Sequence, residues 1–306
     1  MSKIHPEYPA LVLPAHISRQ AVRIWNNGMA LDGDLYKPAS LMGSNARAPA
    51  VVMSHGLGGS KRTAERYAAE FADLGLVALT FTHAGWSESD SHLYRASGAV
   101  GESQASVRMA SQVVDPLEWV QSMRVALDFL EGEDNVDIER MGAWGTSYGG
   151  GIALFAACND DRIKALAIQV GSVAGVRPPL AQHARQRAID MARGILPSVP
   201  DASMDQFPTA PGIPHYPRMR SYRPLNEIYK LKAPILMVDA GAEEMFDIRD
   251  NCGRIRDFLA KKGGVTFHYE VIPGIDHYGI YFDGYQTSMS LARAWFARHL
   301  FHTARP

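Results

Sequence analysis

The sequence has little of what marks several classes of protein. Its 306 residues include only two cysteines, Cys158 and Cys252, too few for a disulfide framework or a cysteine metal site. Lys and Arg number 31 against 32 Asp and Glu, so the net charge of -1 lacks the basic excess of nucleic-acid-binding proteins. No apolar run approaches the ~20 residues of a membrane-spanning helix. The start of the chain, MSKIHPEYPALVLP, is broken by prolines and has no apolar signal-peptide core.

These absences predict the setting of the protein. We expect a cytoplasmic location, where the two cysteines stay as buried or idle thiols. We expect neither a nucleic-acid nor a membrane partner. Because metal-ligand clusters, phosphate-binding loops and cofactor motifs are also missing, we expect no metal and no cofactor.

The order of apolar and polar residues predicts an α/β fold. Hydrophobic residues make up 46% of the chain and charged residues 21%, which is ordinary for a globular enzyme. Short β-like runs alternate with amphipathic stretches, as in a mostly parallel sheet with helices on both faces. Such sheets often use a whole chain of this length, so residues 1–306 are expected to form one domain. The expected strands are 19–25, 29–36, 49–54, 76–81, 141–144, 163–170, 234–238 and 266–272, and the expected helices are 63–74, 116–130, 148–157, 248–262 and 285–300.

Residues 171–230 interrupt this alternation and are a candidate lid. They hold nine of the eighteen prolines, and eight Lys or Arg against four Asp or Glu. So long a connection without structure is uncommon inside a compact domain, which favours a functional lid over a surface loop. Its aromatic residues Phe207, Tyr216 and Tyr222 could line an apolar acyl pocket or fix the lid to the body. Its arginines could dock the lid or attract an anionic substrate.

The pattern G-x-S-x-G occupies residues 145–149, between an expected strand and an expected helix. In that context the pattern forms a nucleophile elbow. The turn is so tight that the residues two before and two after the serine must have almost no side chain. It exposes the serine Oγ at the carboxyl edge of the sheet, where ligands of such folds bind. We therefore predict that Ser147 is a catalytic nucleophile, and not merely part of a glycine-rich turn.

With the elbow in place, the chain resembles the α/β-hydrolase superfamily, in the branch with dienelactone-hydrolase-like, X-Pro-dipeptidyl-peptidase-like and acetyl-xylan-esterase-like members. The resemblance rests on the elbow and on GDLYKP (33–38), SHGLGGSK (54–61), GWSES (85–89) and PGIDHYG (273–279), and covers essentially the whole chain. It implies an α/β-hydrolase fold with a small lid insertion. Dienelactone hydrolase itself differs, because its nucleophile is cysteine where this chain has Ser147.

His277 is the predicted base among eleven histidines. Histidine suits the role because its pKa near 6.5 lets it accept and return a proton at neutral pH. His277 follows the last expected strand in a polar loop, and the resemblance also implies the catalytic histidine in this loop. His55 lies where members of the family shape the oxyanion loop. His83 is expected to be structural or to line the pocket, and the others to be solvated.

The triad acid should be a carboxylate that precedes the histidine in the chain. The end of ILMVD and the loop that follows it offer Asp239, Glu243, Glu244 and Asp247, and the residues alone leave the choice among them open. Similar proteins carry G-D-x-D or A-E-x-D-E-L in this loop, and that resemblance implies Glu243. Glutamate is a recognised variant of aspartate in this role.

An oxyanion hole needs backbone N–H groups directed at the developing negative charge. One donor is expected to be the amide of Tyr148, directly after the nucleophile. The other should come from residues 55–59, the loop after the first central strand, and the resemblance favours Leu57.

Together these residues predict a serine hydrolase that cleaves a carboxylic ester or thioester of a small molecule through an acyl-enzyme. One alternative is an acyltransferase with the same triad, and another is a catalytically weak, hydrolase-like ligand-binding protein. An enzyme is favoured, since every catalytic role has a candidate. The substrate stays open because the lid sets it, and a homodimer is possible.

Overall fold

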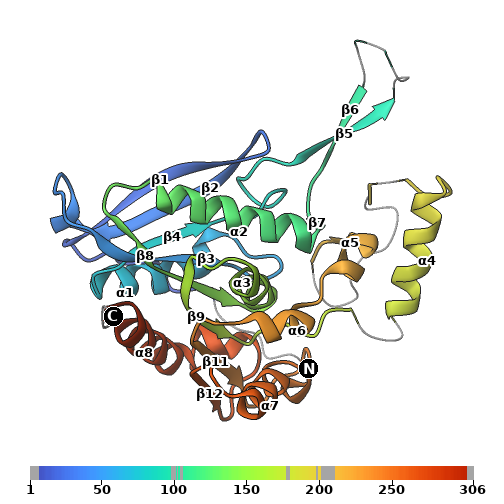
Figure 1. The fold of residues 1–306 in the computed structure, drawn as a ribbon. Coiled ribbons are helices and arrows are strands. Elements are labelled where there is room, and N and C mark those ends of the chain that lie inside the picture. The colour runs from blue at the N-terminus through green and yellow to red at the C-terminus, as the bar shows by residue number, and fades with distance from the viewer. Residues whose placement is uncertain are drawn as a thin grey trace.

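The computed structural model describes residues 7–97, 101, 103, 106–176, 180–197, 199–200 and 211–301. Neighbouring strands of the central sheet are parallel, except at one edge, where β1 with β2 and β2 with β4 pair in antiparallel fashion. The sequence prediction of a mostly parallel α/β sheet is confirmed. The sheet has eight strands, in the spatial order β1 (Ile17–Asn26), β2 (Met29–Pro38), β4 (Val77–Phe81), β3 (Ala48–Ser54), β8 (Val136–Thr146), β9 (Ile163–Gln169), β11 (Ile235–Ala240) and β12 (Phe267–Ile272) (Figure 1).

Every expected strand is present, and local sequence explains the turn that opens the sheet. Asn27 and Gly28 join β1 to β2 with φ angles of 49° and 83°. Positive φ at both positions is what a two-residue type I′ hairpin turn requires. All residues of β3 and β4 are buried, as expected of central strands covered on both faces. β8 begins earlier than expected, at Val136, because this residue already pairs with Ala48 of β3.

Helices cover both faces of the sheet (Figure 1). α2 begins with Pro116, and the carboxylate of Asp115 accepts hydrogen bonds from the N–H groups of Leu117 and Glu118. This cap satisfies N–H groups that have no partner within the helix. The expected helices near 63–74 and 248–262 each begin with a short 3-10 turn, at Lys61 and Ile248. The five helices that pack on the sheet are α1 (Glu65–Asp73), α2 (Pro116–Glu131), α3 (Tyr148–Asn159), α7 (Cys252–Lys262) and α8 (Tyr285–Phe296).

Two apolar cores lie on the two faces of the sheet. One contains Trp119 of α2, Ile152 of α3 and Ile255 of α7. The other contains Phe71 of α1 and Phe296 of α8, whose rings meet edge to face with centroids 5.1 Å apart. The cores fix the carboxyl ends of the strands relative to one another, which is where the expected site residues lie.

Two strands that the sequence analysis missed form an arm that projects from the body (Figure 1). β5 (His92–Ser97) and β6 (Ser106–Ala110) pair with each other in antiparallel fashion. The arm exposes apolar residues to solvent, with Leu93, Val107 and Met109 being 63%, 61% and 69% exposed. They bury little apolar surface, so the arm lacks the strong periodicity that made the other strands predictable.

The segment from 171 to 230, which the sequence analysis proposed as a lid, is partly helical. α4 (Leu180–Ala192) and α5 (Tyr216–Ser221) share a small cluster of apolar residues that includes Ala184 and Met219. α6 (Pro224–Glu227) follows. Tyr222, just before it, belongs to the apolar core that contains Trp119 of α2. A short parallel pairing of β10 (Ile213–Pro214) with β7 (Val113–Val114) also ties the segment to the body. Phe207 lies outside the described residues.

Two arginines of segment 171–230 make local contacts. Nε of Arg218 lies 2.6 Å from Oδ2 of Asp115. Arg223 donates to the carbonyl oxygens of Arg220 and Val176, at 3.0 and 2.7 Å. These contacts favour docking over substrate attraction.

Across the part of the chain that the structure describes, no helix combines the length and the apolar character needed to span a bilayer.

Candidate active site

Ser147 lies in a strained turn between β8 and α3. Its φ of 53° and ψ of -124° are rare for a residue with a side chain, and such strain persists only where the surroundings enforce it. Hydrogen bonds provide that enforcement, because the N–H of Ser147 donates to the carbonyl of Gln169 at 3.0 Å. The Ser147 carbonyl in turn accepts from the N–H groups of Gly150 and Ser172, both at 3.0 Å.

The glycines of the G-x-S-x-G pattern are required by close backbone approach. A Cβ on Gly145 would overlap the backbone of Gly149, and a Cβ on Gly149 would overlap the carbonyls of Ser54 and His55. The chain therefore has no room for a side chain two positions before or after the serine. The turn has the geometry of a nucleophile elbow.

The side chain of His277 joins Ser147 to Glu243. Its Nε2 lies 3.0 Å from Oγ of Ser147, and its Nδ1 lies 2.7 Å from Oε2 of Glu243. The side chains of His277 and Glu243 are each only 2% exposed. A carboxylate can only accept, so the proton of a neutral imidazole lies on Nδ1. Nε2 is then left to accept the hydroxyl proton of Ser147.

The four carboxylates that the sequence left open have different partners. Glu243 contacts the ring of His277, whereas Glu244 accepts the backbone N–H of His277 at 3.0 Å. Asp247 accepts from the backbone and side chain of Arg249 on the surface. Asp239 is fully buried at the end of β11.

Asp239 is a second buried carboxyl group near the site. Its Oδ2 accepts a hydrogen bond from the Tyr269 hydroxyl at 3.0 Å. Burial raises the pKa of Asp239 to about 7, with a smaller contribution in the same direction from Glu243 and opposing ones from Tyr269, Cys252 and His277. This carboxyl group is therefore largely protonated below pH 7.

The two residues expected to form the oxyanion hole both lie beside Ser147. Tyr148 is the first residue of α3, so its N–H has no partner within the helix. Leu57 lies on the loop after β3, and its neighbour Gly56 approaches so closely that a Cβ there would be 2.9 Å from Cβ of Ser147. The two residues border the same cavity as Ser147.

His55 holds this loop through its ring. Nε2 of His55 accepts the N–H of His83 at 3.1 Å, so Nδ1 carries the proton and donates to the carbonyl of Gly56 at 2.7 Å. That carbonyl belongs to the Gly56–Leu57 peptide, so the bond fixes the plane in which the Leu57 N–H lies. Burial lowers the pKa of His55 to about 4, which keeps this tautomer neutral. Of the two roles expected for His83, its position favours the structural one, because its ring is buried and stacks on Trp119 with centroids 4.1 Å apart.

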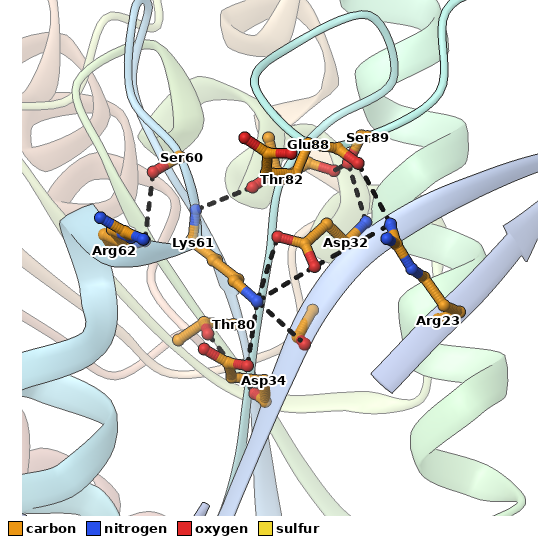
Figure 2. A network of polar contacts seen from close by, with 11 residues as sticks. Arg23, Asp32, Asp34, Ser60, Lys61, Arg62, Thr80, Thr82, Glu88 and Ser89 are labelled. Atoms are coloured by element: carbon orange, nitrogen blue, oxygen red, sulfur yellow. Dashed lines mark hydrogen bonds and ion pairs between the residues drawn. The ribbon is translucent and has the colours of Figure 1, made fainter. Parts of the chain in front are cut away.

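A charged network that the sequence analysis missed anchors the end of the same loop (Figure 2). Nζ of Lys61 lies 3.0 Å from carboxylate oxygens of both Asp32 and Asp34 on β2. The backbone N–H of Lys61 donates to Oγ1 of Thr82 at 3.0 Å. The signal was present in the sequence, because two carboxylates in an otherwise buried strand require a cationic partner.

Two cavities meet at Ser147. We name the first, of about 490 Å³, the lid-side cavity, because Val176, Leu180 and Met219 of segment 171–230 line it. The second, of about 440 Å³, is the loop-side cavity, lined by residues 56–60 of the loop after β3. Leu57, Ser147 and Met245 border both cavities. Sequence reasoning could not find their walls, because these residues come from distant segments. The remaining residues that line the lid-side cavity include Tyr222 and Phe246, and those that line the loop-side cavity include Arg62, Thr63, His277 and Tyr278.

The two cysteines are free thiols and do not form a disulfide. Cys158 and Cys252 are both buried, as expected. Within the described ranges, no group of three or more His, Cys, Asp or Glu residues is arranged to hold a metal ion.

Several known proteins are similar to this chain. The quorum-quenching protein AidA of Acinetobacter baumannii is 26% identical over 258 residues, which cover 70% of this chain and 75% of that protein. The thiohydrolase aneE of Aspergillus aculeatus is 31% identical over 139 residues, which cover 45% of this chain and 36% of that protein. The crystal structure of the α/β hydrolase GrgF from Penicillium sp. sh18 has the same fold, with a TM-score of 0.69 and 17% identity over 93% of this chain and 99% of that one.

The family is shown by a match over more than half of the chain. The profile of the dienelactone hydrolase family matches residues 33–196 of the 306. The matched region runs from β2 through α4 and contains the elbow with Ser147, whereas Glu243 and His277 follow it. From this match and the shared fold, we conclude that the chain belongs to the dienelactone hydrolase family and has the α/β-hydrolase fold.

Proposed function

We propose that the protein is a serine hydrolase that cleaves a carboxylic ester or thioester of a small molecule. The observation that carries the proposal is the unbroken hydrogen-bonded chain from Ser147 through His277 to Glu243. Its serine lies in a strained elbow and opens to two cavities. Membership of a hydrolase family and the thiohydrolase name of one relative support an ester or thioester bond as the target.

In the proposed reaction, Oγ of Ser147 attacks the substrate carbonyl carbon while Nε2 of His277 takes the hydroxyl proton. The carbonyl oxygen becomes an oxyanion that accepts from the N–H groups of Leu57 and Tyr148, each worth about 3 kcal/mol of barrier in comparable enzymes. His277 then gives its proton to the leaving oxygen or sulfur, the bond to that atom breaks, and an acyl-Ser147 ester remains. Glu243 stabilises the imidazolium throughout.

Water completes the cycle through the same two proton transfers. Water now takes the place of Ser147 as the attacking group, and Ser147 is the group that leaves. Nε2 of His277 takes a proton from water, whose oxygen attacks the acyl carbon. The second oxyanion collapses, Ser147 leaves with the proton from His277, and the carboxylic acid is released. An acyltransferase would differ only in that an alcohol, thiol or amine replaces water at this stage.

The described helices of segment 171–230 support its role as a lid within a single α/β-hydrolase domain of residues 1–306. Val176, Leu180 and Met219 from this segment form one wall of the lid-side cavity. We expect a small-molecule substrate there. The cytoplasmic location and the homodimer remain predictions from the sequence, and the second is tested by the mass of the particle in solution.

Intact-protein mass spectrometry with a fluorophosphonate tests the proposed nucleophile. The wild-type chain should gain one phosphonyl adduct, and Ser147→Ala should gain none and lose hydrolysis of a 4-nitrophenyl ester while it stays folded. Equal adduct formation in Ser147→Ala would reject the proposal. Adding an excess of an alcohol acceptor separates the two enzyme classes, because a hydrolase releases mainly acid and an acyltransferase mainly the new ester.

A further inference from the structure

His277 lies on one side of Ser147. Its side chain lines the loop-side cavity, together with Ser60, Arg62 and Tyr278. The wall of the lid-side cavity is instead formed by Tyr148 and by residues of the lid segment. The ring of Phe246 stands edge-on to the ring of His277, with centroids 5.6 Å apart, and borders the lid-side cavity. The imidazole ring of His277, which carries the proton, therefore faces the loop-side cavity and not the lid-side cavity.

Proton transfer decides which part of a substrate each cavity takes. After Ser147 has attacked, Nε2 of His277 must reach the atom that leaves, within about 2.6–3.2 Å. The leaving group therefore lies on the side of His277, in the loop-side cavity. Since the carbonyl oxygen occupies the oxyanion hole, the acyl group extends in the remaining direction, into the lid-side cavity.

The lining of the lid-side cavity suits an apolar acyl group. Its walls include Val176, Leu180, Met219 and Phe246. Among the described residues that line it, none is Lys or Arg. Its one lining carboxylate, Asp247, already lies 2.6 Å from Nη2 of Arg249. A charged acyl group would lose its hydration there without gaining an ionic partner.

The loop-side cavity differs from the lid-side cavity in carrying a positive charge on its wall. Ser60 and Thr63 contribute hydroxyl groups, and Arg62 contributes a guanidinium group. Within the described part of the chain, the Arg62 side chain has no salt bridge, in contrast to its neighbour Lys61, which two carboxylates hold. Figure 2 shows Arg62 apart from those carboxylates. Glu65 attracts the Arg62 guanidinium, but no described carboxylate holds it in a salt bridge, so it can still pair with an anion in the cavity.

From these observations, which rest on the proposed function, we propose that the substrate joins an apolar acyl group to an anionic leaving group. The acyl chain occupies the lid-side cavity against Met219. The alcohol or thiol part occupies the loop-side cavity, with its carboxylate, sulfonate or phosphate beside Arg62. The anion is therefore recognised by the 3-10 turn that follows the loop after β3, and not by the arginines of the lid.

The acyl half of the proposal is tested with Met219→Trp, which fills the lid-side cavity. We expect kcat/KM for 4-nitrophenyl octanoate to fall at least about ten-fold more than kcat/KM for 4-nitrophenyl acetate, since the cost of lost apolar contact grows with each methylene. Leu180→Trp acts on the same wall and gives a second variant if the first does not fold. Equal losses for the two esters would overturn this half.

The leaving-group half is tested with Arg62→Gln and two butanoyl esters, one of 4-hydroxybenzoate and one of its neutral methyl ester. We expect the ratio of kcat/KM for the anionic over the neutral ester to fall about five-fold, the value of one solvent-screened charge pair. The control is Lys232→Gln, which removes another exposed cation. Lys232 pairs with Asp161 and lines neither cavity, so the ratio should stay unchanged. An unchanged ratio in Arg62→Gln would overturn this half.

Failure of the acyl half or of the leaving-group half can be distinguished from failure of the proposed function. Fluorophosphonate labelling of Ser147 should persist in both variants, since neither change removes a triad residue. A reversed assignment of the cavities would leave labelling and ester hydrolysis present. Met219→Trp would then change the selectivity for the leaving group, and Arg62→Gln would change the selectivity for acyl length. If the wild-type chain shows no labelling, the function itself is wrong.

Discussion

Glu244 holds the backbone of His277, with the N–H of His277 donating to Oε2 of Glu244 at 3.0 Å. The residue before it in the chain, Glu243, holds the ring of the same histidine at 2.7 Å. Two adjacent glutamates on the loop after β11 thus fix two different parts of one residue. The backbone contact sets where the loop after β12 lies, and the side-chain contact sets the tautomer and orientation of the imidazole.

This division predicts unequal effects of two matched substitutions. Glu243→Gln should lower kcat by as much as about 10⁴, since an amide in this position favours the wrong imidazole tautomer. Glu244→Gln keeps an oxygen that can accept the His277 N–H, so kcat should fall by less than about ten-fold, the equivalent of one weakened hydrogen bond. Steady-state kinetics on one activated ester compares them. A larger loss in Glu244→Gln would mean that the acid is misassigned by one residue.

A second prediction concerns the space around the elbow. Gly149→Ala places a Cβ where the carbonyls of Ser54 and His55 already lie, and backbone atoms cannot rotate away as a side chain can. We expect a loss of about 3 kcal/mol or more in unfolding free energy, together with a large loss of activity. The control is Gly132→Ala at the end of α2, where an added Cβ would be 3.5 Å from its nearest neighbour. Urea unfolding should separate the two variants clearly, and equal midpoints would contradict the steric account.

A third prediction follows from the network of Figure 2. Lys61→Met leaves Asp32 and Asp34 without their common cation, and both carboxylates are largely buried. Removing one partner of a buried ion pair typically costs about 3–5 kcal/mol. Lys232→Met breaks a pair with Asp161 in which both side chains are mostly exposed, so its unfolding free energy should barely change. Similar values for the two variants would mean that the Lys61 network is screened by solvent.

The sequence predicted those parts of the molecule in which local pattern and position agree. Each expected strand was found because apolar runs of strand length, bounded by turn residues, are determined by burial on the sheet. The strained turn at Ser147 could be predicted because its glycines are required by steric contact within a few residues. The contact of His277 with Ser147 followed from its loop being at the carboxyl edge of the sheet.

The parts that could not be predicted depend on contacts between distant residues. β5 and β6 pair with each other on the surface, so burial imposes little pattern on them. The partnership of Lys61 with Asp32 and Asp34 joins residues about thirty positions apart. Two carboxylates in a buried strand signal a cationic partner, but sequence spacing does not say which residue it is. The residues alone left open which carboxylate at the end of β11 or in the loop after it meets His277, since only the path of the loop decides this. The family resemblance implied Glu243, whose carboxylate does contact the His277 ring.

The buried His55 ring predicts how stability depends on pH on the acidic side. Its native pKa of about 4 lies below the roughly 6.5 expected in the unfolded chain. Between these values the unfolded chain binds the proton and the native chain does not, so this histidine makes stability fall as pH decreases from about 6.5 to 4. In His55→Asn, whose amide can still donate to the Gly56 carbonyl, the fall between pH 6.5 and 5 should be smaller. Parallel urea midpoints for the two proteins would show that His55 does not titrate in this way.

Asp239 should change the pH dependence of stability in the direction opposite to His55, over nearly the same pH range. Its native pKa of about 7 lies above the 3.8 of an unperturbed aspartate, so in this window the unfolded chain loses the proton first. This carboxyl group therefore makes stability fall as pH rises from about 4 to 7, whereas the His55 ring makes it rise. Asp239→Asn keeps a neutral group of the same shape beside the Tyr269 hydroxyl, and removes the titration.

The stability of Asp239→Asn relative to the wild-type protein should therefore increase with pH, by at most about 1.4 kcal/mol per pH unit. Most of the increase should occur between pH 5 and 7, because the wild-type penalty grows until the native carboxyl group itself ionises near pH 7. Urea unfolding of the two proteins at several pH values measures this difference directly. A difference that stays constant from pH 4 to 7 would mean that Asp239 ionises in the native state as readily as in the unfolded chain. The buried carboxyl group would then need a cationic partner or solvent access, which its contact with the Tyr269 hydroxyl does not supply.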